Sequence, residues 1–138
     1  MDAYIDAVHA MGGSIMASIC IKPNVLYPTV DEAVWMPNNV AEWQDVIRAL
    51  VVRYSREKPY VSHWAIANEM NIGEWGGCPY YIKSPDDYFE YYKITAKPIR
   101  EALPDVQIGG PSCAAGAGNS AYDDGHPNIF HVLSSCAN

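Results

Sequence analysis

Apolar residues follow two different spacings along this chain of 138 residues, one helical and one typical of buried strands. The clearest helical pattern starts at Asn39, which Glu42 follows three residues later as the partner in an N-terminal capping box. Apolar positions then recur every three or four residues, at Trp43, Val46, Ile47, Leu50, Val51 and Tyr54. This spacing predicts an amphipathic helix whose apolar stripe packs against a sheet.

A second helix is predicted after Ser84, which has the character of an N-cap and is followed by Pro85 at the first helical position. Its apolar stripe consists of Tyr88, Tyr92, Thr95, Ala96, Ile99 and Leu103. Pro98 lies inside this pattern and cannot donate a hydrogen bond to the carbonyl of Ile94. We therefore expect a kink or a break in this helix near Ala96.

Three short apolar runs separate the helical patterns and have the length of buried strands. They cover residues 14–21, 61–67 and 106–111, and the first is too short to cross a membrane. A further helix is expected over residues 1–11, and a weak one over residues 127–135. The apolar face of the helix expected over residues 1–11 carries Tyr4, Ile5, Val8 and Met11. Helices and strands thus alternate, which implies parallel strands joined by right-handed helical crossovers.

The length of the chain leaves two α/β architectures open. A closed TIM (β/α)8 barrel takes about 250 residues. A chain of 138 residues therefore holds either a small doubly wound domain or about three consecutive βα units of a barrel. The chain starts on a predicted helix with no strand before it and ends just after another predicted helix. We therefore expect a partial TIM barrel, in which residues 1–138 form a piece of a single domain.

The most informative polar residues, Asn68 and Glu69, follow directly on the apolar run 61–67. In parallel α/β folds, ligands bind at the carboxyl ends of the strands, so a carboxylate there is a candidate for chemistry. Strand alternation places His63 and Ala65 on the same face as Glu69, which predicts that Glu69 points into the barrel. Asn68 points away in a regular strand. Both side chains can therefore reach one ligand only if the strand bulges or stops there.

The segment after Glu69 is a loop rich in glycine and aromatic residues, with a size that suits a ligand. Trp75, Tyr80 and Tyr81 offer flat aromatic faces on which a sugar ring could stack. Glu74 lies in the same loop and offers a second carboxylate. We take Glu74, Trp75 and Tyr80 as candidate substrate-binding residues.

Composition narrows the classes of ligand. Nine basic residues stand against sixteen acidic ones, a formal net charge of -7, which disfavours binding to nucleic acids and to anionic membranes. The four cysteines and four histidines lack the Cys-x-x-Cys and His-Glu-x-x-His spacings of zinc sites. A phosphate-binding loop requires a lysine after its glycines, and no lysine follows Gly109 and Gly110. We therefore expect neither a metal nor a cofactor.

Three segments carry a resemblance to a known enzyme family. Residues 63–71 (HWAIANEMN), residues 88–99 and residues 108–111 resemble the retaining glycoside hydrolases of clan A, and most of all family 39, the β-xylosidase and α-L-iduronidase group. The resemblance implies a TIM barrel of which this chain covers about strands 3 to 5, and a carbohydrate substrate. It also implies that Glu69 is the general acid/base for hydrolysis of the O-glycosidic bond and that Asn68 binds the sugar 2-hydroxyl.

The chain departs from the family pattern in two places. Met70 stands where the family usually has proline after the glutamate. The family's nucleophilic carboxylate lies at the end of the seventh strand, beyond Asn138. We therefore expect the chain alone to be inactive. Its expected partners are the remaining barrel units of a parent chain. Two alternatives stay open. One is a non-catalytic α/β carbohydrate-binding or interaction module, and the other is a small doubly wound enzyme that pairs Glu69 with carboxylates from its own loops.

Overall fold

The computed structural model describes residues 1–110 and residue 112. In this part of the chain the main elements follow the order α1 (Asp2–Ala10), β1 (Ile15–Ile19), α2 (Val40–Val52), β2 (Val61–Ile66), α3 (Pro85–Ala102) and β3 (Gln107–Gly109). Short helical turns lie between them at Asn24–Leu26, Arg53–Glu57 and Gly73–Gly76. The helix expected over residues 127–135 lies outside the described residues. The alternation of helices and strands agrees with the prediction from the hydrophobic pattern.

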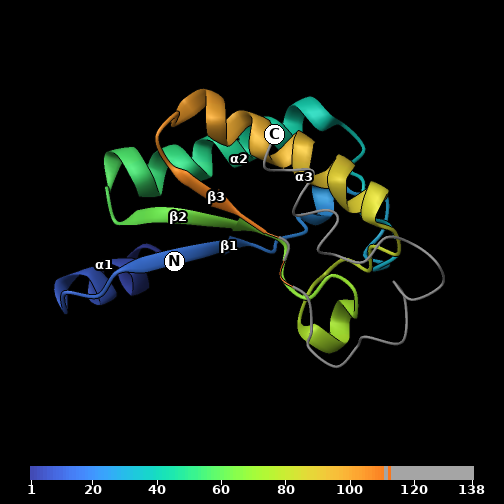
Figure 1. Ribbon diagram of the computed structural model, residues 1–138, viewed down its shortest axis with the longest axis horizontal. Helices are drawn as coiled ribbons and strands as arrows, with labels where there is room; N and C mark the ends of the chain where they lie inside the picture. The colour runs from blue at the N-terminus through green and yellow to red at the C-terminus, as the bar shows by residue number, and fades with distance from the viewer. Residues whose placement is uncertain (111, 113–138) are drawn as a thin grey trace.

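The three strands form one parallel sheet in the order β1-β2-β3, with β2 in the centre (Figure 1). Met16 of β1 lies opposite His63 of β2, which in turn lies opposite Gln107 of β3. The predicted sequential, parallel arrangement is thus confirmed. Because all three strands run in the same direction, their carboxyl ends meet at one edge of the sheet.

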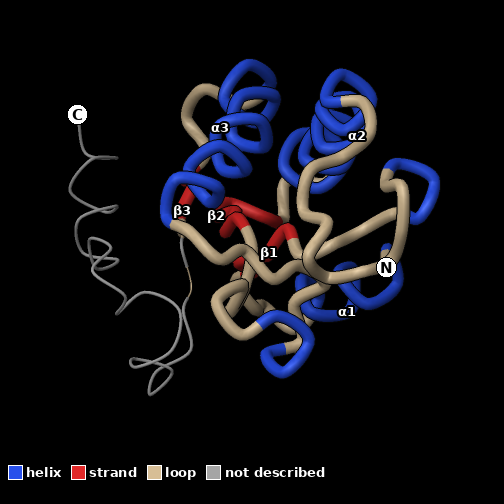
Figure 2. Tube along the Cα trace, turned by 90° about the vertical axis from the view of Figure 1, so that its right-hand side faces the viewer, coloured by secondary structure: helices blue, strands red, loops and turns tan. Residues whose placement is uncertain are grey.

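Helices α2 and α3 pack side by side over the same face of the sheet (Figure 2). Trp64 and Ile66 point toward these helices and are buried, as strand alternation predicted. The opposite face carries Met16, which is 74% exposed, and its exposed neighbour His63. Ser18 and Gln107, on the same side, are exposed as well. The sheet therefore has one covered and one open side.

The helix α2 begins at the expected cap. The Asn39 side-chain oxygen accepts hydrogen bonds from the backbone N–H groups of Ala41 and Glu42, at 3.0 and 3.4 Å. The Asn39 amide donates in return to the Glu42 carboxylate at 3.2 Å. The two bonds that Asn39 accepts satisfy backbone N–H groups that have no partner inside the helix. Trp43, Ile47 and Val51 of the predicted stripe are buried, whereas Val46 is 37% exposed and lies at its edge.

The helix α3 is one element from Pro85 to Ala102, so of the kink or break expected near Ala96 the break does not occur. Proline at position 98 leaves the Ile94 carbonyl without the N–H that normally binds it. The Gln44 side chain of α2 supplies a replacement and donates to that carbonyl at 3.1 Å. The neighbouring Trp43 indole N–H donates to the Thr95 hydroxyl at 3.0 Å. Two buried or half-buried hydrogen bonds thus fasten α2 to α3 where the proline interrupts the helical bonding.

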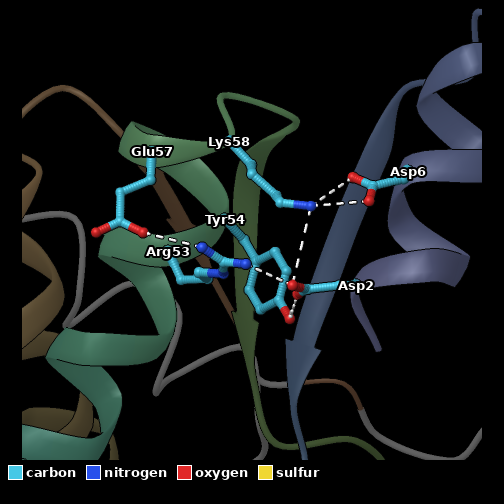
Figure 3. Close-up of polar contacts among 6 residues, drawn as sticks. All are labelled: Asp2, Asp6, Arg53, Tyr54, Glu57 and Lys58. Atoms are coloured by element: carbon cyan, nitrogen blue, oxygen red, sulfur yellow. Dashed lines mark hydrogen bonds and ion pairs between the residues drawn. The ribbon is translucent and has the colours of Figure 1, made fainter.

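The helix α1 is held by charged side chains rather than by the expected apolar stripe. Tyr4 and Met11 are 75% and 80% exposed, and in this helix only Ile5 is buried. Figure 3 shows that the carboxylate of Asp2 instead meets the end of α2. Asp2 pairs with Arg53 and accepts a hydrogen bond from the Tyr54 hydroxyl at 2.5 Å. Asp6 accepts from the Lys58 ammonium at 2.7 and 2.8 Å. The stripe prediction for α1 was therefore wrong at Tyr4 and Met11, whereas Ile5 is buried and Val8 is half-buried.

The pH dependence of stability should reveal this cluster. Hydrogen bonds from Arg53 and then Tyr54 lower the pKa of Asp2 from 3.8 to about 2. A carboxylate with a depressed folded-state pKa stabilises the fold above its unfolded pKa and loses that contribution as the pH falls toward the folded pKa. We therefore expect Asp2→Asn to lower the melting temperature above about pH 4, with a difference from wild type that shrinks as the pH falls to about 2.

Thermal unfolding followed by circular dichroism at several pH values between about 2 and 6 measures this difference. Asp45→Asn is the matched control, because Asp45 pairs only with Arg48 on its own helix and is exposed. A difference between wild type and Asp2→Asn that does not change with pH would contradict the role given to the Asp2 carboxylate.

Candidate functional site

The chain leaves regular strand geometry directly after β2. Ala67 and Glu69 have φ angles of 64° and 47°, in the left-handed region that residues other than glycine rarely adopt. The Ala67 N–H still donates to the Ile19 carbonyl at 3.1 Å, and the Ala67 carbonyl accepts from the Ser18 hydroxyl at 3.1 Å. The sheet therefore holds Ala67 firmly, and the change of direction falls at Asn68 and Glu69.

This geometry replaces the strand alternation expected for Glu69. Because β2 ends at Ile66, the alternating pattern does not extend to Asn68 and Glu69, and the two side chains are not forced onto opposite faces. A stop of the strand was one of two conditions under which the Asn68 and Glu69 side chains could reach a common ligand. The strand β2 does stop, at Ile66.

Backbone hydrogen bonds on both sides fix the position of Glu69. Its N–H donates to the Ser112 carbonyl at 2.7 Å, and its carbonyl accepts from the Ile72 N–H at 3.0 Å. The next residue, Met70, is buried and its carbonyl accepts from the Ile82 N–H at 3.0 Å. Positive-φ residues persist only where surrounding contacts hold them, and such residues cluster at functional sites. Glu69 therefore sits on a backbone that is strained and well anchored.

The turn Gly73–Gly76 folds back against the side chains of Asn68 and Glu69. A Cβ atom placed on Gly76 would lie 2.5 Å from the Glu69 Cβ and 2.6 Å from its Oε2. The Asn68 amide donates to the Gly76 carbonyl at 3.4 Å. The close approach of Glu69 requires that position 76 has no side chain, and the Gly76 carbonyl contacts Asn68, so Gly76 is part of the site. The sequence carried a signal for it in the Gly76-Gly77 pair, but did not show which residue it would meet.

Of the loop residues that we took as candidates, two are at the surface and one is in the core. Trp75 is 94% exposed and Glu74 is exposed. Tyr80 is 0% exposed, and its hydroxyl bonds the Ile21 carbonyl and lies 3.0 Å from the Tyr27 hydroxyl. A fully buried ring cannot stack on a sugar, so the structure assigns Tyr80 a supporting role beneath the loop instead.

An open hollow of about 350 Å³ lies next to the loop, and three of the residues in its walls, Glu32, Asn71 and Ile72, were not expected to bind a ligand. The lining residues are Glu32, Asn71, Ile72, Trp75 and Tyr81. Glu32 organises this region, because its carboxylate accepts from the Glu74 N–H at 2.8 Å and its carbonyl accepts from the Tyr81 N–H at 2.8 Å. No motif in the sequence links Glu32 to this loop, since the contact joins residues far apart in the chain.

The described part of the chain gives no sign of a metal centre or a membrane span. It contains no group of three or more His, Cys, Asp or Glu side chains that could hold a metal ion. None of the helices in residues 1–110 is both long and apolar enough to cross a bilayer. The site is thus built from the Asn68 amide, the Glu69 carboxylate and the loop around them.

Comparison with known proteins places this arrangement among carbohydrate-active enzymes. The chain is similar to a monomeric β-xylosidase from Caulobacter crescentus CB15, with a TM-score of 0.71 and 21% identity over 99% of this chain and 27% of that one. It is also similar to a family 39 enzyme from Xanthomonas axonopodis pv. citri, with a TM-score of 0.66 and 22% identity over 99% of this chain and 26% of that one. These two likenesses concern the fold.

A sequence likeness points the same way. A β-xylosidase of Geobacillus stearothermophilus is 27% identical over 85 residues, which make up 59% of this chain and 16% of that protein. The chain thus spans between about one sixth and one quarter of the length of these relatives. The family model for glycosyl hydrolases family 39 matches residues 14–137. Because this match covers nearly the whole chain, the chain belongs to glycosyl hydrolase family 39.

Proposed function

We propose that this chain is part of the TIM-barrel catalytic domain of a retaining, β-xylosidase-like glycoside hydrolase, and that Glu69 is its general acid/base. The observation that carries the proposal is the position of Glu69, directly beyond the carboxyl end of the central strand on an anchored backbone with positive φ. That edge of a parallel sheet is where barrel enzymes place their catalytic groups.

The open face of the sheet supports the barrel reading. In a TIM barrel the helices cover the outer face of the sheet and the inner face meets the other strands. Here α2 and α3 cover one face (Figure 2), and Met16 and His63 on the other face are exposed to solvent. Strands β1 and β3 also leave an unpaired edge each within the described residues. We propose that residues 1–138 are a piece of one barrel domain and that further βα units of a parent chain complete it.

The proposed chemistry needs two carboxyl groups about 5 to 5.5 Å apart. One gives a proton to the leaving oxygen, and the other attacks the sugar and forms a covalent intermediate. The first group then removes a proton from the water that releases the sugar. Glu69 takes the proton-transfer role. The nucleophile would come from a later strand of the parent domain, as the family resemblance implies.

Asn68 and the loop would position the sugar. We propose that the Asn68 amide binds the 2-hydroxyl, because its neighbour Glu69 addresses the adjacent glycosidic oxygen. Its present contact with the Gly76 carbonyl, at 3.4 Å, is long for a hydrogen bond and leaves the amide available to a ligand. Trp75, which is exposed beside the hollow, and Glu74 remain candidates for contacts with the carbohydrate.

The burial of Met70 bears on the departure from the family pattern. A proline after the catalytic glutamate would stiffen the turn by fixing φ. Met70 instead buries its side chain and accepts the Ile82 N–H through its carbonyl, which ties the turn to the far end of the loop. The turn is thus held by packing and a backbone bond, and the proposed role of Glu69 does not require the proline.

The first test replaces the acid in a protein that contains this chain together with the nucleophile. Glu69→Gln should slow hydrolysis of alkyl xylosides by about 10²- to 10⁴-fold, because their poor leaving groups need the proton. For aryl xylosides with good leaving groups, the rate of the first step, in which the leaving group departs, should fall far less. Steady-state kinetics on both substrate classes measures the ratio.

Glu74→Gln is the matched control, since Glu74 is a carboxylate of the same loop and should not change the ratio between the two classes. Equal losses on both substrate classes for Glu69→Gln would show that Glu69 has another role. Turnover of aryl xylosides by residues 1–138 alone would overturn the assignment too, because one carboxyl group cannot both attack and protonate.

The second test concerns Gly76. Gly76→Ala should displace the Glu69 side chain, because the new methyl would lie 2.5 Å from the Glu69 Cβ. We expect kcat/KM in the same longer protein to fall by about tenfold to a hundredfold, since small misplacements of catalytic groups have effects of this size. Gly109→Ala is the control, because a methyl at Gly109 meets no atom within 4 Å. Unchanged kcat/KM in Gly76→Ala would refute the contact as a determinant of activity.

The third test concerns the open face. Residues 1–138 alone should associate, because exposed apolar side chains and unpaired strand edges favour contact between copies. Met16→Lys should reduce the association measured by sedimentation velocity, whereas Val25→Lys should not, although Val25 is 87% exposed and equally apolar. A wild-type monomer with a sharp cooperative thermal transition would argue against a partial barrel.

A further inference from the structure

Glu32 connects two segments that lie far apart in the chain. It belongs to the segment between β1 and α2, and its carboxylate accepts a hydrogen bond from the Glu74 backbone N–H at 2.8 Å, 42 positions further on. The backbone carbonyl of Glu32 accepts from the Tyr81 N–H, also at 2.8 Å. A single residue thus binds both the turn Gly73–Gly76 and the segment that follows this turn.

The start of the turn has a shape that admits the Glu32 carboxylate. Gly73 is buried, and its φ angle of 58° lies in the left-handed region. A Cβ atom placed on Gly73 would collide with the Glu32 carboxylate and would lie 3.1 Å from the Tyr81 Cβ. Glycine accepts both the positive φ and such a close approach. The contact with Glu32 is therefore part of how the turn is built.

The end of the same turn meets the two proposed functional residues. A Cβ atom placed on Gly76 would lie 2.6 Å from the Glu69 Oε2, so the backbone at this position lies directly against the Glu69 carboxyl group. The Gly76 carbonyl accepts from the Asn68 amide at 3.4 Å. The position of Gly76 therefore limits where both side chains can lie.

A hydrogen bond inside the turn connects the residue that Glu32 holds with the end that meets the site. The Glu74 carbonyl accepts from the Gly77 N–H at 3.0 Å, which closes the turn around Gly76. The Glu74 N–H is the group that Glu32 binds. Releasing Glu74 from Glu32 would therefore allow Gly76 to move as well.

We propose that Glu32 is a positioning residue for the acid/base chemistry of the site. Its carboxylate holds the turn Gly73–Gly76, and Gly76 in turn keeps the Glu69 side chain in place. In this role Glu32 acts through the turn and not by contact with the substrate. The proposal rests on the proposed function, because it assumes that Glu69 transfers the proton.

Reach matters more than charge in this role, because the group that Glu32 binds is a neutral backbone N–H. Glutamine keeps the length of the side chain and an acceptor oxygen. Aspartate keeps the charge but is one methylene shorter, and alanine has no acceptor. Glu32→Gln should therefore behave like wild type, whereas Glu32→Asp and Glu32→Ala should not.

The test uses the longer protein that contains this chain together with the nucleophile. For Glu32→Ala and Glu32→Asp, we expect kcat/KM on alkyl xylosides to fall by about tenfold to a hundredfold, since small misplacements of catalytic groups have effects of this size. The value for aryl xylosides with good leaving groups should fall far less, because their departure does not need the proton. A loss of folded protein would instead lower both values equally. Glu90→Ala is the matched control, because Glu90 is an exposed glutamate on α3.

Hydrogen exchange of the same variants gives a second readout that does not depend on catalysis. Peptides that cover residues 73–78 should exchange faster in Glu32→Ala and Glu32→Asp than in wild type, because the Glu74 N–H loses its acceptor. Glu32→Gln and Glu90→Ala should exchange like wild type. Unchanged exchange in Glu32→Ala would overturn the proposal, and so would faster exchange with an unchanged ratio between the two substrate classes.

Glu69→Gln, measured alongside, separates this proposal from the proposed function. If Glu69→Gln changes the ratio between the substrate classes and Glu32→Ala does not, the positioning role alone is refuted. Equal losses on both classes in Glu69→Gln would refute the acid/base role and the positioning role with it. Wild-type kinetics in Glu32→Asp together with a loss in Glu32→Gln would show that the charge of Glu32 is what counts, which would also overturn the proposal.

Discussion

The hydrogen bond from the Ala67 N–H to the Ile19 carbonyl is the contact on which the candidate site depends. It is the last bond between β1 and the chain that continues from β2, and the chain turns into the left-handed region at this residue. The sheet therefore extends right up to Asn68 and Glu69, whose position is set by parallel pairing on both sides of β2. A rigid base of this kind lets the two polar side chains lie at the mouth of the sheet without relying on a flexible loop for their direction.

A layer of buried aromatic rings supports the other side of the same loop. Tyr80 lies 5.8 Å from Tyr27 and 5.0 Å from Tyr91 between ring centroids, and Trp43 meets Tyr27 edge to face at 6.0 Å. Burial raises the pKa of Tyr27 to about 12, so its hydroxyl stays protonated in neutral solution. These three tyrosines thus connect the loop with helices α2 and α3.

Sequence patterns predicted the parts of this structure that local interactions determine. The caps at Asn39 and Ser84 are confirmed, because each uses N–H groups within the first turn of its own helix. The stripe on α1 failed because ion pairs with residues 53–58 hold that helix, and such pairs leave no periodic signal. The position of Tyr80 was missed for a similar reason. An aromatic residue in a loop looks the same in sequence whether it faces solvent or fills the core.

The candidate site likewise contains residues that a local sequence pattern indicates and residues that only the fold brings together. Glu69 and Asn68 could be proposed as site residues because a polar pair after an apolar run is visible in the sequence. Glu32 and the hollow that it lines together with Asn71 were not found, because the folded chain alone brings Glu32 next to Glu74 and Tyr81. The uninterrupted α3 belongs to this second group as well, since the residue that compensates for its proline lies on another helix.

That compensation couples two positions on different helices. Pro98 is accommodated inside α3 because the Gln44 side chain donates to the carbonyl that the proline leaves open. Replacing Gln44 alone would leave that part-buried carbonyl without a protein donor, and replacing Pro98 alone would make the glutamine amide compete with a backbone N–H for the same oxygen. Each residue therefore restricts the substitutions that the fold tolerates at the other.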